Sequence, residues 1–129
     1  MAASEPEKKK LIVGVDYGTT YSGVSYVWSN SAGIEDVILL TRWGNLEVAD
    51  GRYGYEKQVP SKIAYAPRTT WGYNTERGAL AYCWTKLLLD RYAEASDFDD
   101  TEIREVEGPG LMQTPPGKTP EDVVSDYLT

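Results

Sequence analysis

Apolar residues in the first third of the chain follow the pattern of β-strands. The run 11–15 (LIVGV) is β-branched and apolar enough to be buried on both faces of a sheet, and we take the first strand to be 11–17. Apolar and small side chains alternate over residues 21–28, and a third strand at 36–41 follows the turn residues 29–33. Three strands with short links predict an antiparallel meander.

The link between the first two strands carries polar chemistry. Asp16 ends the first strand, Gly18 allows a positive φ or a close backbone approach, and Thr19, Thr20 and Ser22 supply hydroxyls. Successive backbone N–H groups in such a turn can form a concavity that binds anions. A single carboxylate beside phosphate oxygens can hold hydrated Mg²⁺. The residues therefore predict a nucleotide phosphate clamp, and the alternative is an ordinary hairpin with a polar turn.

The middle of the chain predicts loops, a strand and a long helix. Residues 43–55 contain three glycines and read as loops with a short hairpin at most, and 59–65 reads as a strand with Pro60 near its start. Asn74 or Thr75 can cap a helix. Apolar residues at helical spacing then predict a helix over 75–92: Leu80, Cys83, Trp84, Leu87 and Leu88. Cys83 is expected to be a small buried hydrophobic residue.

The last third of the chain combines an acidic segment with a helix start. Residues 97–110 are acidic, end in Gly-Pro-Gly and predict a loop with little strand and a solvated surface. Thr119 can cap a helix that has Pro120 at its first position and carboxylates in its first turn. The sequence therefore predicts a helix that begins at residue 120.

Composition limits the function classes. The chain has 129 residues, which favours one domain, and its net charge of −7 argues against nucleic acid and against an anionic membrane surface as partners. One cysteine and no histidine exclude an internal disulfide, zinc sites and histidine-dependent nucleophilic catalysis. The polar segment 1–10 is expected to be a disordered arm without a signal peptide, so a reducing, cytoplasmic location is the default.

The segment 11–28 (LIVGVDYGTTYSGVSYVW) resembles the first phosphate-binding motif of the actin-like ATPase superfamily, and most closely that of the heat-shock protein 70 family. The resemblance implies that Asp16 coordinates Mg²⁺ through water. It also implies that the β- and γ-phosphates of ATP are held by Gly18, Thr19, Thr20 and Tyr21. Tyr17 and Gly23 depart from the residues common in the family, and neither is one of the implied ligands.

Later segments match the same family in order. Residues 59–65, 71–74, 84–90 and 118–124 resemble successive family segments, so the resemblance spans about residues 11–129. It implies an α/β (in this segment α+β) fold, an incomplete ribonuclease H-like, actin-like ATPase lobe in which a β-meander precedes helices. It also implies that Lys86 reaches the γ-phosphate, where a cation stabilises the transferring phosphoryl group. The other reading of Lys86 is a solvated lysine on a helix.

Several parts of the complete family pattern do not occur in these residues. The second phosphate segment, of the Asp-x-Gly-Gly-Gly-Thr type, is absent, as is the peptide-binding domain. We expect a partial nucleotide-binding domain over 11–129 that is inactive in hydrolysis by itself, from a chaperone whose complete form binds ATP/ADP, unfolded clients and co-chaperones. Two alternatives stay open: a non-catalytic interaction module derived from an incomplete lobe, and a sugar kinase of the same superfamily.

Overall fold

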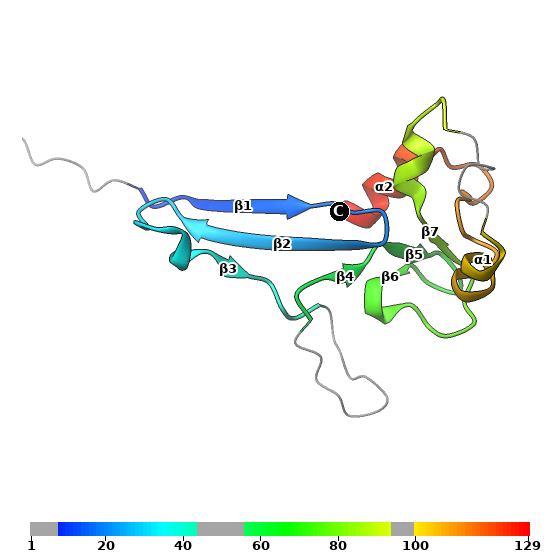
Figure 1. Ribbon diagram of the computed structural model, residues 1–129, viewed down its shortest axis with the longest axis horizontal. Coiled ribbons are helices and arrows are strands. Elements are labelled where there is room, and N and C mark those ends of the chain that lie inside the picture. The colour runs from blue at the N-terminus through cyan, green and yellow to red at the C-terminus, as the bar shows by residue number, and fades with distance from the viewer. Residues whose placement is uncertain (1–7, 44–55, 94–99) are drawn as a thin grey trace, which may run out of the picture.

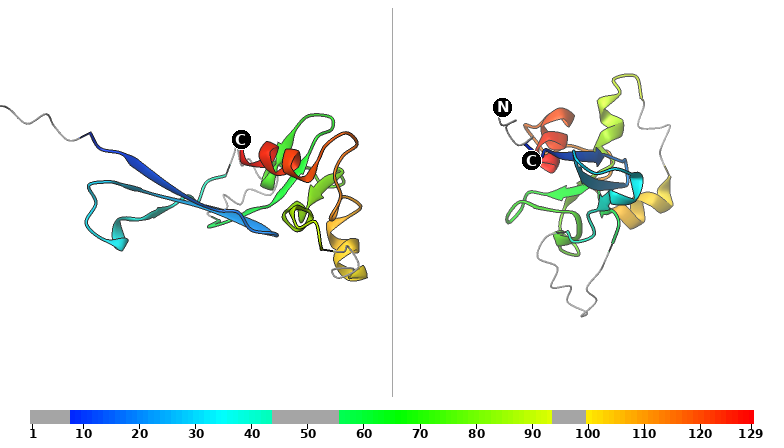
Figure 2. Two further views of the ribbon diagram at one scale, coloured as in Figure 1. Left: turned by 90° about the horizontal axis from the view of Figure 1, so that it is seen from above. Right: turned by 90° about the vertical axis from the view of Figure 1, so that its left-hand side faces the viewer.

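The computed structural model describes residues 8–43, 56–93 and 100–129. These residues form a mixed α+β domain with two antiparallel sheets and two α-helices (Figure 1). One sheet extends as a long arm, and the other lies with the helices in a compact body at the end of that arm (Figures 1 and 2). The coarse α+β expectation is therefore confirmed.

The hairpin sheet, as we name the arm, contains strands β1 (Leu11–Asp16), β2 (Tyr21–Trp28), β3 (Ile38–Leu39) and β4 (Val59–Pro60). Strand β2 is central, because β1, β3 and β4 all pair with it antiparallel. The predicted meander is confirmed in its order β1-β2-β3. Strand β3 is shorter than predicted because the 3-10 helix η1 (Ile34–Asp36) precedes it, and the Asp36 carboxylate accepts the Ala32 N–H there.

The second sheet has β5 (Lys62–Ala64) between β6 (Thr70–Trp71) and β7 (Ala81–Cys83). The predicted strand 59–65 is thus divided at Ser61, and its first half belongs to the hairpin sheet while its second half starts a new sheet. This division joins the two sheets covalently. It also places Pro60 on β4, whose pairing with β2 is only two residues long.

The predicted helix over 75–92 is wrong. The chain instead forms the 3-10 helix η2 (Gly72–Asn74), strand β7, and the 3-10 helix η3 (Thr85–Leu89). Positive φ angles of 82° at Gly78 and 57° at Trp84 interrupt any continuous helix. Pairing with β5 places Tyr82 and Cys83 on a strand, where both are buried. Cys83 is buried as predicted, but on a strand.

Two α-helices complete the described residues. Helix α1 (Thr101–Glu107) lies where a loop was predicted, so that prediction is wrong for 101–107; Asp100 caps this helix by accepting the Glu102 N–H. Helix α2 (Pro120–Leu128) confirms the predicted start. Asp122 N–H donates to the Thr119 hydroxyl at 3.2 Å, and the Asp122 carboxylate accepts the Thr119 N–H at 2.8 Å.

The hydrophobic core lies in the compact body. One cluster joins Ile63 of β5, Tyr82 of β7 and Val123 of α2, and a second joins Cys83 to Leu111 and Met112. By contrast, every residue of β1 is exposed, so the prediction that 11–15 is buried on both faces is wrong. Among the described residues no layer lies over the apolar side chains of β1, and strand pairing alone does not bury them.

Some predictions lie partly or wholly outside the described residues. These are the first seven positions of the arm 1–10, the loop residues 44–55, and residues 97–99 of the predicted acidic loop. Lys8, Lys9 and Lys10 are described and are exposed and non-regular. Trp43, at the start of that loop, is buried, and its indole N–H donates to the Glu56 carbonyl at 2.8 Å. No helix within the described ranges has the length and apolarity needed to cross a membrane.

Candidate functional site

The connection between β1 and β2, which we call the 17–20 turn, is tight. A Cβ on Gly18 would lie 2.0 Å from the Tyr21 carbonyl oxygen, so a side chain at this position cannot be accommodated. Close backbone approach, rather than a positive φ, therefore explains the glycine. Within the described part of the chain, no group accepts a hydrogen bond from the N–H groups of Gly18, Thr19 or Thr20. These N–H groups are able to bind an anion.

Lys86 lies at this turn. It belongs to the 3-10 helix η3, and its ammonium Nζ donates a hydrogen bond to the Tyr17 carbonyl oxygen at 2.8 Å. The same ammonium lies 5.9 Å from the centre of the Tyr17 ring. Sixty-nine residues separate the two positions in sequence, and the tertiary fold brings them together. Lys86 is thus placed on a 3-10 helix rather than the predicted α-helix, with its cation beside the predicted phosphate-binding residues.

Tyr17 connects the turn to the compact body. Its hydroxyl lies 3.3 Å from the Thr85 hydroxyl, and its ring is 5.8 Å from the ring of Tyr127 on α2. Burial raises the pKa of the Tyr17 phenol, and the hydrogen bond with Thr85 opposes that rise. Tyr17 is therefore neutral at pH 7, and its packing orients both the turn and the neighbouring lysine.

A second set of contacts holds the other side of the turn. The Ser61 N–H donates to the Thr20 carbonyl at 2.8 Å, and the buried hydroxyls of Ser22 and Ser61 are 2.8 Å apart. The Tyr127 hydroxyl donates to the Pro60 carbonyl at 3.1 Å. Burial raises the pKa of the Tyr127 phenol, while hydrogen bonding with the two serines lowers it. Both sides of the turn are consequently fixed to the compact body.

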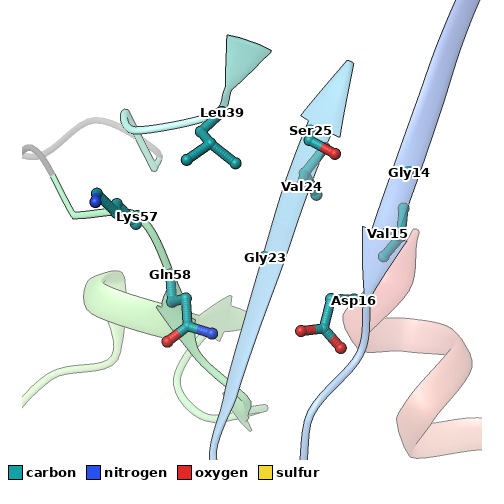
Figure 3. A pocket seen from close by; sticks show the side chains of 9 residues that line it. All are labelled: Gly14, Val15, Asp16, Gly23, Val24, Ser25, Leu39, Lys57 and Gln58. Carbon is teal, nitrogen blue, oxygen red and sulfur yellow. The ribbon is translucent and has the colours of Figure 1, made fainter. Parts of the chain in front are cut away.

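Asp16 is exposed at the end of β1 and borders an open hollow of about 520 Å³ (Figure 3). Gly14 and Gly23 contribute no side chains to this hollow, and Lys57 and Gln58 border it on the other side. Figure 3 shows the Asp16 carboxylate directed away from its own strand toward the region of Gly23 and Gln58. The carboxylate therefore has both solvent access and room for a hydrated ion.

The side chains near the 17–20 turn can be compared with the ligands that Mg²⁺, the metal implied by the resemblance, prefers. No group of three or more histidine, cysteine or acidic residues able to hold a metal is present among the described residues. Mg²⁺ keeps several waters and uses one or two protein carboxylates, so one accessible carboxylate beside a hollow fits a hydrated Mg²⁺. Asp16 is the residue that would hold it.

The remaining predicted site residue, Tyr21, begins β2 and is 47% exposed. It pairs with Pro60 of β4, so its backbone is held at the junction of the turn with the body. Asp16, Gly18, Thr19, Thr20, Tyr21 and Lys86 thus all lie at or beside one end of the hairpin. The residues themselves group the first five, because they are adjacent in the chain, whereas only the family resemblance places Lys86 with them.

Sequence reasoning missed several residues of this site. Lys57 and Gln58 border the hollow, and Thr85 and Tyr127 support Tyr17. In the sequence, Tyr17 differs only as a departure from the family pattern, and no local signal gives it a role in the site. The one available signal was that Thr85 directly precedes Lys86, whereas the positions of Lys57 and Tyr127 depend on long-range contacts.

Cys83 takes no part in this site. Burial, followed by the nearby negative charge of Glu107, raises the pKa of its thiol to about 12. A thiol that stays protonated at pH 7 is a poor nucleophile. This agrees with the prediction of a buried hydrophobic residue.

Comparison of the chain with protein-family models, with curated proteins and with solved structures finds no match.

Proposed function

We propose that this chain binds the phosphate groups of Mg²⁺–ATP or Mg²⁺–ADP at the 17–20 turn. In this proposal it is the nucleotide-binding portion of a heat-shock protein 70-like chaperone, with an incomplete actin-like ATPase lobe as its fold. The observation that carries the proposal is the 2.8 Å hydrogen bond between Lys86 Nζ and the Tyr17 carbonyl. It supports the proposal because it brings a cation to the turn whose N–H groups are open, and this turn directly follows Asp16 in the chain.

Each group has a distinct role in this proposal. The N–H groups of Gly18, Thr19 and Thr20 bind phosphate oxygens, and the hydroxyls of the two threonines and Tyr21 add donors. Lys86 gives up its hydrogen bond to the Tyr17 carbonyl and binds the terminal phosphate instead. Asp16 holds hydrated Mg²⁺, which neutralises phosphate charge when it is bound. The described residues contact phosphates only, so we propose binding without hydrolysis for this chain, and clients and co-chaperones only for a complete protein.

Titration calorimetry with Mg²⁺–ATP, Mg²⁺–ADP and Mg²⁺–pyrophosphate tests the assignment. Because charge-assisted hydrogen bonds contribute about 1.5–3 kcal/mol, we expect Lys86→Ala and Asp16→Asn each to weaken binding by about tenfold or more. Lys8→Ala and Glu35→Gln change exposed charges of the same types outside the site and serve as matched controls. Equal affinity in wild type and both site variants would contradict the assignment.

A second measurement separates phosphate binding from binding of the base. Adenosine lacks the phosphates, so it should bind far more weakly than Mg²⁺–pyrophosphate at the same site. A phosphate-release assay of the chain alone should give no turnover above the rate without protein. Tight adenosine binding without pyrophosphate binding would place the nucleotide site elsewhere.

One observation favours a different function. Apolar side chains of the hairpin sheet are exposed, among them Ile12, Val13 and Val15 at 54%, 53% and 58%. Contiguous exposed apolar surface is typical of interaction sites. This supports an interaction module as the second candidate function, and it is compatible with nucleotide binding. A sugar kinase stays the third candidate, tested by assaying phosphorylation of a polyol.

A further inference from the structure

The outer edge of β1 is open. Strand β1 pairs with β2 on one side, and no described strand pairs with its other side (Figure 1). The Ser29 N–H donates to the Lys10 carbonyl at 2.8 Å, so residue 10 directs its backbone groups toward β2. Since the direction alternates along a strand, the backbone groups of Leu11, Val13 and Val15 face outward.

Over residues 8–43, 56–93 and 100–129, this edge lacks the features that normally prevent pairing with another strand. Edge strands of soluble proteins are protected by proline, bulges, inward-pointing charges or a covering segment. Residues 11–15 contain no proline and no charge, and β1 pairs with β2 in continuous register without a bulge. Val15, nearest the compact body, is the most exposed of the apolar residues of β1, so the body does not cover its side chain.

We propose that this edge binds a second copy of the same chain, by antiparallel pairing of β1 with β1 of the partner about a two-fold axis at Val13. This proposal names the partner of the interaction module given above as the second candidate function. In this register Val13 pairs with its own copy and Leu11 pairs with Val15. All three residues direct backbone groups outward, so each pair can exchange two hydrogen bonds.

Charge complementarity selects this register. With the axis at Val13, Lys10 of each copy lies directly opposite Asp16 of the other. Both residues are exposed, and directly opposite side chains share a face of the sheet. Lys10 and Asp16 would form a non-hydrogen-bonded pair, because both direct their backbone groups toward β2. The side chains of such pairs lie closer together than those of hydrogen-bonded pairs. The arrangement forms two Lys–Asp pairs when the exposed Asp16 carboxylate turns from the Gly23 side of β1, where it lies in Figure 3, to the outer edge.

Side-chain shape agrees with the same register. Ile12 of one copy lies opposite Gly14 of the other. The large isoleucine side chain therefore has room, because glycine has no side chain. On the other face Leu11, Val13 and Val15 of both copies form one apolar stripe. Because each copy contributes a single strand, the interface is small for a specific complex. We therefore expect a dissociation constant in the micromolar range, roughly 1–100 µM.

Sedimentation velocity from about 1 to about 200 µM protein, a range that brackets micromolar affinities, tests the dimer. Val13→Lys places two cations on the axis and should give a monomer, whereas Val106→Lys on α1 makes the same change at an 82% exposed position and should still dimerise. A wild type that stays monomeric, or assemblies that grow beyond two copies, would overturn the proposal.

A charge exchange tests the register. Lys10→Asp and Asp16→Lys should each weaken self-association by about tenfold, because like charges then lie opposite one another. An equimolar mixture of the two variants, or the double variant, should restore the dimer, because each Asp again faces a Lys. Unchanged self-association in the single variants, or no restoration in the mixture, would overturn the proposal.

The phosphate site and the β1 dimer can be tested independently, because different variants affect each of them. Lys10 lies outside the nucleotide site, so Lys10→Asp should dimerise about tenfold more weakly and still bind Mg²⁺–pyrophosphate with unchanged affinity. Lys86→Ala should lose that binding and still dimerise. Loss of dimerisation in Lys86→Ala would count against the β1 interface, whereas loss of pyrophosphate binding in both variants would count against the phosphate site as assigned.

Discussion

The hairpin sheet and the compact body contain similar residues in very different surroundings. Ile12 of β1 is 54% exposed, whereas Ile63 of β5 is 1% exposed. Val13 is 53% exposed, whereas Val123 of α2 is fully buried. Strand β5 is covered by α2 and flanked by two strands, while β1 has one neighbour and no covering layer among the described residues. Apolar composition specifies a strand, and burial requires a second layer.

The largest difference between the two regions is expected when an isoleucine in each is replaced by alanine. We expect Ile63→Ala to lower the free energy of unfolding by about 2–5 kcal/mol, because it removes a buried side chain and leaves a cavity. Ile12→Ala should cost less than about 1 kcal/mol, since its side chain is already half in water. Denaturant unfolding of both variants measures the difference, and similar losses would show that β1 is buried in solution.

A second test adds a methyl group in each region. A Cβ on Gly110 would lie 1.9 Å from the Ala81 carbonyl, where backbone must move, and we expect Gly110→Ala to cost about 1–3 kcal/mol. A Cβ on Gly14 would meet the Ser25 hydroxyl at 3.2 Å, and a side chain can rotate away. Gly14→Ala should therefore be nearly neutral in the same unfolding measurement. A large loss at residue 14 would indicate that the hairpin is more crowded than the structure shows.

A third test breaks the junction between the two regions. Ser61→Ala removes a buried hydroxyl that is 2.8 Å from the Ser22 hydroxyl and that also hydrogen-bonds with Tyr127, so two hydroxyls each lose one hydrogen-bond partner. We expect a loss of about 1–3 kcal/mol and faster hydrogen exchange at the 17–20 turn. Ser25→Ala on β2, the strand that also contains Ser22, lies beside the open hollow and is the matched control. Equal effects of the two variants would mean that the junction does not hold the turn.

The smallest expected effect is the pH dependence of the compact body. The Thr119 backbone N–H, followed by its hydroxyl, lowers the pKa of Asp122 below 3.8. Hydrogen bonding from Lys118, followed by that from Tyr65, lowers the pKa of Asp126 in the same direction. Since both pKa values are depressed in the folded state, their stabilisation is present above about pH 4 and is lost as pH falls through the folded-state values.

Thermal unfolding between about pH 6 and about pH 2.5 measures this loss. Asp126→Asn should be less stable than wild type at pH 6 and nearly equal to it at the acid end. Glu35→Gln in the 3-10 helix η1 gives a control with the same charge change at an exposed position. A constant difference between Asp126→Asn and wild type across the range would contradict the assignment.

Local signals in the sequence determined several elements of this protein. The apolar run 11–15, the polar link and the alternation after it predicted β1, the 17–20 turn and β2, because hairpin formation depends on neighbouring residues. Thr119 and Pro120 predicted the start of α2 for the same reason. Asp16, Gly18, Thr19, Thr20 and Tyr21 could be grouped because they are adjacent in the chain.

Only the tertiary structure decided the rest. The spacing of Leu80, Cys83 and Leu87 fits a helix, but pairing of β7 with β5 buries Tyr82 and Cys83 instead, and strand pairing between distant segments has no local signal. Lys86 reaches the turn through a contact across sixty-nine residues. Exposure of β1 likewise depends on which layers pack over it. Local patterns determine how a segment can fold, and long-range packing determines what that segment contacts.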